Sequence, residues 1–241
     1  MKTHYKLIAV AFFLLISTTV NAQVLISLLF GEALNSDKIE FGLTGGMNRS
    51  YIYDISEANG LNSFNLGFYF HIFLKENAYL STGVLVKSNV GAKGMPTYDI
   101  GNPDFDVLYQ DGSLTKKIHY FYVPIMWQQR FDNRWYVEGG IQLGLRNKSW
   151  DYFNVKVIDG ELEYKLDVRD QYKYLDAGFI AGAGYKFKKE IKSIAAGINY
   201  YYGLVNVSEV SGTTIKNSSL YLYVKIPIGA GKKDTSTKET N

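Results

Sequence analysis

Residues 135–146 read WYVEGGIQLGLR, and residues 174–187 read YLDAGFIAGAGYKF. In both segments large apolar residues alternate with glycine, polar or charged residues. Trp135 and Ile141 fall on one side of the first segment, and Glu138 falls on the other. Because successive side chains of a strand point to opposite faces, this period of two predicts β-strands with one apolar and one polar face.

Six further segments show the same alternation. The eight predicted strands cover residues 39–49, 64–74, 78–87, 118–130, 135–146, 174–187, 194–204 and 219–228. An even number of strands of about ten residues each is typical of bacterial outer-membrane barrels. The fold class predicted from the sequence is therefore all-β, an eight-stranded antiparallel up-and-down transmembrane β-barrel.

The connections between these strands alternate between long and short. The long ones cover residues 50–63, 88–117, 147–173 and 205–218, and the short ones cover 75–77, 131–134 and 188–193. Short periplasmic turns and long external loops are typical of an up-and-down barrel in an outer membrane, whereas a Greek-key sandwich has no reason to alternate in this way. With eight strands and this alternation of connections, both chain ends are expected on the periplasmic side.

The chemistry of the two faces predicts which one meets lipid. The apolar face is expected to point outward and the face with glycine, tyrosine and charges inward, the reverse of a soluble lipocalin-like barrel. Interiors of small barrels are filled by side chains, so the inward charges are expected to form a structural polar network. Its predicted members are Glu40, His71, Lys87, Arg130, Glu138, Arg146, Asp176 and Lys225. The expected ion pairs are Arg130 with Glu138, Glu40 with Lys225, and Arg146 with Asp176.

Outward aromatic residues are expected to form two girdles at the membrane interfaces. Those expected near the short turns are Trp127, Trp135, Tyr185 and Phe187, and those near the long loops are Phe64, Phe121 and Tyr202. Ordinary preference of aromatic residues for strands is the alternative explanation.

The N-terminal 22 residues have the features of a signal peptide. Lys2 and Lys6 precede the apolar run LIAVAFFLLI, and Val20-Asn21-Ala22 provides small residues for cleavage after Ala22. An uncleaved anchor helix is the alternative, but the run is too short to span a bilayer. Residues 23–38 are expected to form a periplasmic segment able to adopt a short helix, 39–228 the barrel, and 229–241 a disordered periplasmic tail.

Composition excludes several kinds of function. The chain has no cysteine, which rules out disulfides, thiolate catalysis and cysteine-held clusters. Removing Lys2 and Lys6 with the leader lowers the formal charge from +3 to +1, which gives no electrostatic case for binding nucleic acid. Cysteine ligands and His pairs at metal-binding spacing are both missing, so no metal and no cofactor are predicted.

Several short motifs resemble the PorT-like outer-membrane β-barrel proteins of Bacteroidetes. They are residues 24–48 (VLISLLFGEALNSDKIEFGLTGGMN), Tyr122-Val123-Pro124-Ile125, Asp176-Ala177-Gly178 with Gly182-Ala183-Gly184, and Tyr201-Tyr202-Gly203-Leu204. The resemblance covers essentially the whole mature chain and implies an eight-stranded barrel in an outer membrane, without implying an activity. Two features depart from the family: Tyr122 stands where an acidic residue is frequent, and a polar tail follows the last strand.

The sequence favours a non-enzymatic barrel that contacts outer-membrane lipid. Its long loops, 50–63, 88–117 and 147–173, would contact another envelope protein or a surface ligand. One alternative is a narrow pore or small-solute channel. Another is a hydrolase at the rim, in which His119 would work with the loop acids Asp104, Asp106 and Asp111, although the chain has no G-x-S-x-G nucleophile motif. The last alternative is a soluble secreted β-protein.

Overall fold

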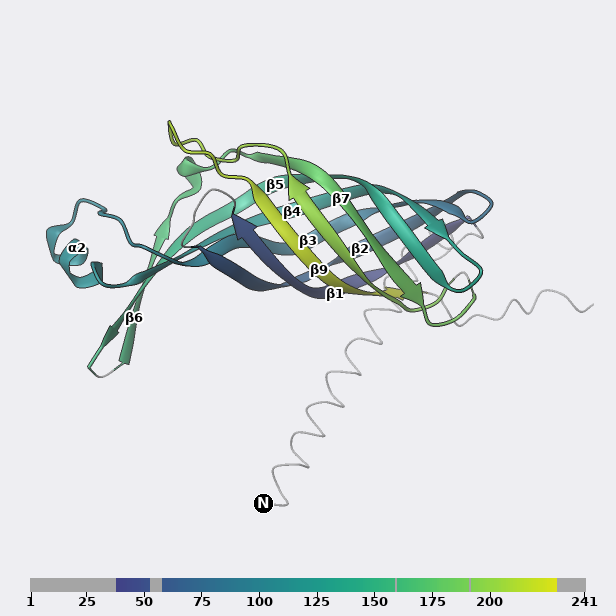
Figure 1. The fold of residues 1–241 in the computed structure, drawn as a ribbon, viewed down its shortest axis with the longest axis horizontal. Helices are drawn as coiled ribbons and strands as arrows, with labels where there is room; N and C mark the ends of the chain where they lie inside the picture. The colour runs from purple at the N-terminus through teal and green to yellow at the C-terminus, as the bar shows by residue number, and fades with distance from the viewer. Residues whose placement is uncertain (1–37, 53–57, 159, 191, 229–241) are drawn as a thin grey trace, which may run out of the picture.

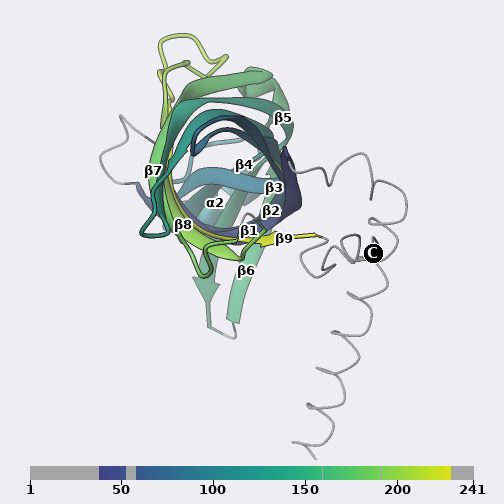
Figure 2. The same ribbon diagram turned by 90° about the vertical axis from the view of Figure 1, so that its right-hand side faces the viewer.

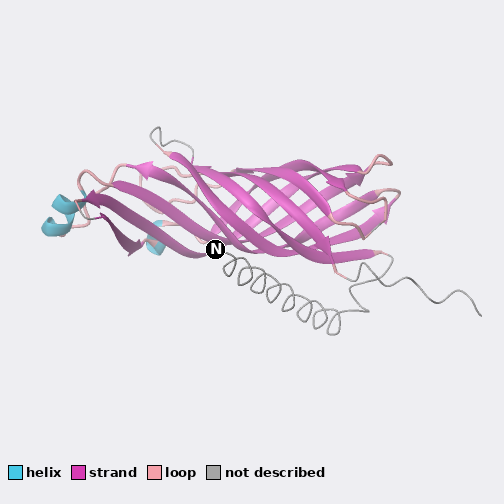
Figure 3. Ribbon diagram, turned by 90° about the horizontal axis from the view of Figure 1, so that it is seen from below, coloured by secondary structure: helices cyan, strands magenta, loops and turns pink. Residues whose placement is uncertain are grey.

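The computed structural model describes residues 38–52, 58–158, 160–190 and 192–228. This part of the chain is almost entirely β-structure (Figures 1 and 3). The strands are β1 (Ile39–Ile52), β2 (Asn59–Lys75), β3 (Ala78–Met95), β4 (Ser113–Arg130), β5 (Trp135–Val157), β6 (Gly160–Asp167), β7 (Leu175–Lys186), β8 (Ala195–Gly203) and β9 (Asn217–Pro227). One short helix, α2 (Pro103–Tyr109), and one 3-10 turn, η1 (Arg169–Gln171), complete the described elements.

Eight of the nine strands close into a ring. Each pairs antiparallel with its neighbours, and the ring closes where β1 pairs with β9 and β4 pairs with β5. Viewed from the turn end, these strands surround a single interior (Figure 2). β6 stays outside the ring because it pairs only with the distal half of β5. The predicted eight-stranded antiparallel barrel is confirmed.

The short connections lie together at one end of the barrel. Between β2 and β3 only Glu76 and Asn77 separate the paired residues Lys75 and Ala78. Both turn residues have positive φ, at 38° and 41°. This is the backbone of a type I′ turn, whose twist matches that of the flanking strands.

The two faces of the barrel have opposite chemistry. On β5 the outward residues Trp135, Ile141 and Leu145 are 52%, 43% and 41% exposed, whereas the inward Glu138 and Gln142 are 4% and 0% exposed. The predicted assignment of apolar residues to the outside is therefore correct. From Trp135 to Leu145 there are ten steps of about 3.3 Å, which at a strand tilt of about 40° give an apolar belt about 25 Å tall.

Aromatic residues gather at the edge of this belt nearest the short turns. The rings of Trp135 and Tyr185 lie 5.3 Å apart, and those of Tyr185 and Phe187 lie 6.1 Å apart. The Arg134 guanidinium lies 4.9 Å from the Tyr185 ring centroid. The turn end thus carries a girdle of the kind expected from the sequence.

At the other end the strands run far beyond the belt and form an external lobe, which comprises residues 88–118, 147–158 and 160–174 (Figure 1). Much of what the sequence predicted as loops 88–117 and 147–173 is therefore regular structure, and loop 50–63 is shortened because β1 reaches Ile52 and β2 starts at Asn59. The predicted strand ends were wrong because apolar alternation marks only the part of a strand that crosses lipid. Above the belt the outward face is polar too, so apolar and polar residues no longer alternate along the sequence.

The external lobe has its own packed core. Phe105 of α2 stacks on Tyr109, and its ring lies 4.6 Å from Tyr164 of β6 and 5.3 Å from Phe153 of β5. The helix begins at Pro103, with the Asn102 side chain accepting a hydrogen bond from Phe105 N. A helix that covers the inner face of the extended sheet fixes the shape of the lobe.

A buried ion pair ties the lobe together. Lys116 Nζ of β4 lies 2.6 Å from Asp151 Oδ2 of β5, and the Tyr98 hydroxyl donates to the same oxygen over 2.8 Å. Burial and the Asp151 charge raise the pKa of Tyr98, so this hydroxyl stays a donor at all physiological pH values.

Three expectations concern residues outside the described part of the chain: the signal peptide (1–22), the periplasmic segment (23–38, of which only Lys38 is described) with its short helix, and the tail (229–241). They remain predictions. Among the described residues, no helix combines the length and apolar character needed to span a bilayer.

Candidate functional site

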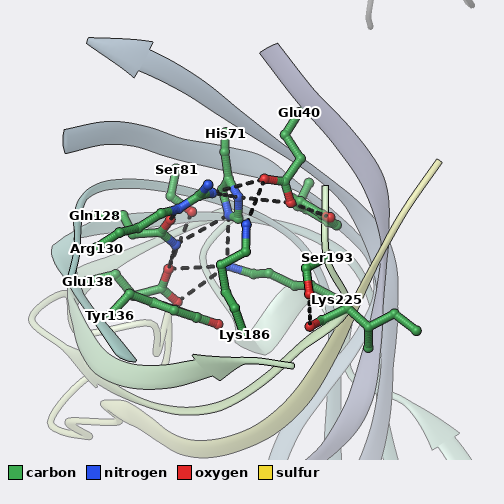
Figure 4. A network of polar contacts seen from close by, with 12 residues as sticks. Glu40, His71, Ser81, Gln128, Arg130, Tyr136, Glu138, Lys186, Ser193 and Lys225 are labelled. Atoms are coloured by element: carbon green, nitrogen blue, oxygen red, sulfur yellow. Dashed lines mark hydrogen bonds and ion pairs between the residues drawn. The ribbon is translucent and has the colours of Figure 1, made fainter. Parts of the chain in front are cut away.

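A polar cluster around Glu40 closes the turn end of the barrel (Figure 4). Arg130 Nη2 donates to Glu40 Oε2 over 3.0 Å, and the Tyr69 hydroxyl donates to Glu40 Oε1 over 2.9 Å. Lys186 Nζ lies 3.5 Å from Glu40 Oε2, and His71 Nδ1 lies 2.7 Å from Arg130 Nη2. Glu40 is only 3% exposed. A carboxylate withdrawn from water this far needs such partners to stay charged.

A second cluster lies deeper in the barrel around Glu138, which is saturated with donors. Lys225 Nζ and Gln128 Nε2 lie 3.1 Å and 2.9 Å from its Oε2. Asn199 Nδ2 and the Tyr223 hydroxyl donate to its Oε1 over 2.8 Å and 2.9 Å. The carboxylate therefore fixes side chains from β4, β8 and β9 onto β5.

Gln128 joins the two clusters into one network. Its Oε1 accepts from Arg130 Nε over 2.8 Å, while its Nε2 donates to Glu138. Every strand of the ring contributes to this network. The contributors, from β1 to β9, are Glu40, Tyr69 and His71, Ser81, Gln128 and Arg130, Glu138, Lys186, Asn199, and Tyr223 and Lys225.

Nearer the external end, tyrosines close the interior around Asp176. The Tyr122 and Tyr201 hydroxyls each donate to the Asp176 carboxylate over 2.9 Å, as does Asn217 Nδ2. The Tyr122 ring packs 5.1 Å from Tyr120 and 5.6 Å from Tyr201. Asp176 is fully buried, and no ion pair reaches it in the described part of the chain.

A small cavity separates the two polar levels. Its volume is about 50 Å³, and the polar residues lining it include Asn65, Gln142, Asn199 and Tyr221. That is room for about three or four water molecules, far below the roughly 300–1,000 Å³ of a small-molecule site. The side-chain oxygens of Asn65, Gln142 and Asn199 accept no hydrogen bond from any described residue, so water suits the cavity.

The structure brings together five of the eight residues predicted for the polar network. These five are Glu40, His71, Arg130, Glu138 and Lys225. The expected pairings were nevertheless wrong, because Arg130 pairs with Glu40, and Lys225 pairs with Glu138. Long side chains cross the narrow interior, so a partner across the barrel is as reachable as a neighbour on the next strand.

The other three predicted residues lie elsewhere. Asp176 belongs to the tyrosine level, and Arg146, predicted as its partner, donates to the carbonyl of Lys173 at the rim. Lys87 was predicted to point inward, but it is exposed and lies 6.0 Å from the outward Phe64 ring. A β-bulge explains the reversal: opposite Leu66 and Gly67, β3 places Lys87 and Leu85, with Val86 as the extra residue.

Several members of the network were not predicted. They are Tyr69, Ser81, Gln128, Lys186, Asn199 and Tyr223. Five of them are neutral, whereas the predicted set held only charged residues and histidine; the sixth, Lys186, is charged and was also left out. All six share the inward orientation of their strands. The alternation of inward and outward positions along each strand, applied to every polar residue, predicts all of them.

The rim site expected for a hydrolase does not form. His119 points outward from β4, whereas α2, which carries Asp104 and Asp106, packs against the inner face of the lobe. No hydrogen bond or ion pair joins His119 to a carboxylate within the described ranges, and no group of three metal-binding side chains occurs there.

A closed antiparallel barrel with an apolar belt, an aromatic girdle and a polar interior defines the class of outer-membrane β-barrel proteins. A family model described as an outer membrane protein beta-barrel domain matches residues 21–209. The chain belongs to this family, and it is a protein of the bacterial outer membrane. The resemblance to the PorT-like proteins of Bacteroidetes stays a prediction from the sequence.

Solved structures of the same kind are similar in fold. Ail of Yersinia pestis is 12% identical with a TM-score of 0.39, covering 78% of this chain and 97% of its own. Neisserial surface protein A is 10% identical with a TM-score of 0.40, covering 78% and 96%. OprG from Pseudomonas aeruginosa is 9% identical with a TM-score of 0.34, covering 78% and 93%. No curated protein matches the sequence.

Proposed function

We propose that this protein is a non-enzymatic, non-conducting barrel that presents its external lobe to another envelope protein or a surface ligand. The observation that carries this proposal is the lobe itself. The strands continue about 12 residues beyond Leu145, or about 40 Å along β5, and the added length is packed and capped by α2. A barrel that only crosses the membrane has no need of this structure.

The tips of the lobe carry apolar side chains that lipid cannot cover. Ile158 at the β5–β6 turn is fully exposed, and Val107 of α2 is 75% exposed. Both lie well beyond the belt. These two side chains are therefore accessible to another molecule at the far end of the lobe.

A filled interior supports the non-conducting part of the proposal. The Glu40–Glu138 network spans the ring at one level and the Asp176–tyrosine cluster spans it at another, and the cavity between them measures about 50 Å³. Water-filled channels occur in much wider barrels.

Planar-bilayer recording tests the closed interior. Purified protein inserted into the bilayer is expected to add no steady conductance steps, because two layers of hydrogen-bonded side chains block the path. A porin inserted under the same conditions serves as the positive control. Reproducible single-channel steps would instead favour the narrow-pore alternative.

Site-specific photo-crosslinking in living cells tests the role of the lobe. A photoreactive amino acid at Ile158 or Val107 is expected to give discrete adducts with a cell-surface component. The same amino acid at Lys188, which is exposed at the turn end, is the matched control and should not give those adducts. If the lobe positions yield no adduct, or only those of the control, the proposed surface role is wrong.

A further inference from the structure

Basic side chains, four positive lysines around one histidine, gather on the outward face of β3–β6 at and above the upper edge of the apolar belt. They are Lys87 of β3, Lys117 and His119 of β4, Lys148 of β5 and Lys165 of β6. This set is called the basic face below. All four lysines lie within electrostatic range of the His119 ring. A cluster of one sign on one face attracts groups of the opposite sign.

The strand registers place these residues side by side. His119 pairs with Lys148, and Lys117 pairs with Trp150 across β4 and β5. Lys165 pairs with Tyr152 across β5 and β6. Because paired residues share a face, the lysines and the two aromatic rings form one continuous outward surface.

Aromatic rings support the lysines on this surface. Lys165 Nζ lies 3.8 Å from the Trp150 ring centroid, and Lys117 Nζ lies 4.8 Å from that of Tyr152. Cation–π contacts of this kind hold an ammonium group in place and leave its other hydrogens free to donate. Trp and Tyr are also the residues that anchor proteins at the membrane–water interface.

Carboxylates do not neutralise the basic face. None of its four lysines forms an ion pair in the described part of the chain. Three carboxylates of β6 share this face: Asp167 is bound by Arg169 at 3.0 Å, and Glu163 and Glu161 lie further out toward the β5–β6 turn, where neither forms an ion pair with these lysines among the described residues. Lys116 is paired with Asp151, but it lies on the opposite, inner face. The basic face therefore has an excess of positive charge.

Its height matches the head groups of the outer leaflet. His119 lies two residues beyond the exposed Phe121, and Lys148 lies three beyond the exposed Leu145, about 7–10 Å along each strand. A lipid whose acyl chains lie on Phe121 and Leu145 would carry its head group to the level of these lysines.

We propose that the basic face binds the phosphate groups of a phosphorylated glycolipid of the outer leaflet. The lysines donate to the phosphate oxygens, Trp150 and Tyr152 lie against the sugar, and the belt below holds the acyl chains. A lipid is the occupant that this surface fits because the apolar and basic regions are continuous. A soluble anion would use only the upper half. This site is independent of the partner proposed for the tips of the lobe.

Native mass spectrometry on the intact protein in phosphatidylcholine nanodiscs tests the site, with diphosphorylated lipid A as the probe. The variant K117Q/K148Q/K165Q is expected to bind this lipid at least about tenfold more weakly than the wild type, because each lysine near charged lipid contributes substantially. The control K75Q/K188Q/K189Q removes the same charge from exposed positions at the turn end and should bind within about twofold of the wild type.

Two further binding measurements identify which part of the lipid is recognised. Dephosphorylated lipid A should bind the wild type as weakly as the diphosphorylated form binds the triple variant, and inorganic phosphate should not displace the lipid. The shift in electrophoretic mobility between boiled and unboiled samples verifies that both variants are folded. Unchanged binding by the triple variant, an equal loss in the control, or equal binding of dephosphorylated lipid A would overturn the proposal. Displacement by inorganic phosphate would show a soluble-anion site and also overturn it.

Discussion

Replacing Glu138 by alanine lowers the free energy of unfolding by about 3–5 kcal/mol, the usual cost of removing one partner of a buried ion pair. Glu138 is 4% exposed, and Lys225 loses its only carboxylate partner among the described residues. Donors from Gln128, Asn199 and Tyr223 lose their acceptor at the same time. Urea titration of the protein in lipid vesicles, followed by the shift in electrophoretic mobility on heating, measures the change.

A double-mutant cycle separates the ion pair from the rest of the network. Glu138→Ala combined with Lys225→Met is expected to cost less than the sum of the two single variants, with a coupling energy of about 1–3 kcal/mol. Glu161→Ala, which removes an exposed carboxylate from β6, is the control and should cost less than about 0.5 kcal/mol. Strict additivity, or a loss below about 1 kcal/mol for Glu138→Ala, would show that the network does not hold the barrel together.

The substitution Ile141→Arg is expected to destabilise the protein by about 2–4 kcal/mol, because Ile141 points outward near the middle of the apolar belt. The guanidinium would have to stand in hydrocarbon or draw water and head groups to it. The matched variant is Ile158→Arg, which makes the same change at the fully exposed tip of the β5–β6 turn and should cost at most about 0.5 kcal/mol. The same urea titration in vesicles compares the two.

The contrast between positions 141 and 158 is more informative than either value alone. Both are exposed isoleucines on or beside β5, and nothing in their side chains distinguishes them. Ile141 lies in a paired strand and is 43% exposed, Ile158 lies in a turn and is fully exposed, and the solvent around them is acyl chains in the first case and water in the second. Equal effects of the two substitutions would mean that the belt is not the lipid-contacting surface.

In our proposal the charged interior has a structural role and the lobe has a binding role. The network links all eight strands of the ring from within, and in the proposed function the barrel serves as the support for the lobe. Everything that distinguishes the chain from a minimal barrel lies above the belt: the extended β3–β5 strands, the added strand β6, the helix α2 and the basic face. The functional proposals concern this region for that reason.

The sequence by itself determined the class of fold, the number of strands in the ring and the direction in which each face points. Contact with lipid favours an alternation in which large apolar side chains take every second position, as they do between Trp135 and Leu145 except at Gly139, and such a pattern can be recognised in the local sequence. The positions of the short turns, such as Glu76-Asn77, followed from the same pattern.

Only the tertiary structure decided which charges meet, where β3 changes face and how far the strands continue. Glu40 and Arg130 are 90 residues apart and meet across the lumen, a contact set by the diameter and register of the closed barrel. The bulge beside Lys87 shifts parity without a clear signal in the residues themselves. Beyond the belt, water solvates the outer face, so a long strand there no longer has to carry the alternation that made the rest predictable.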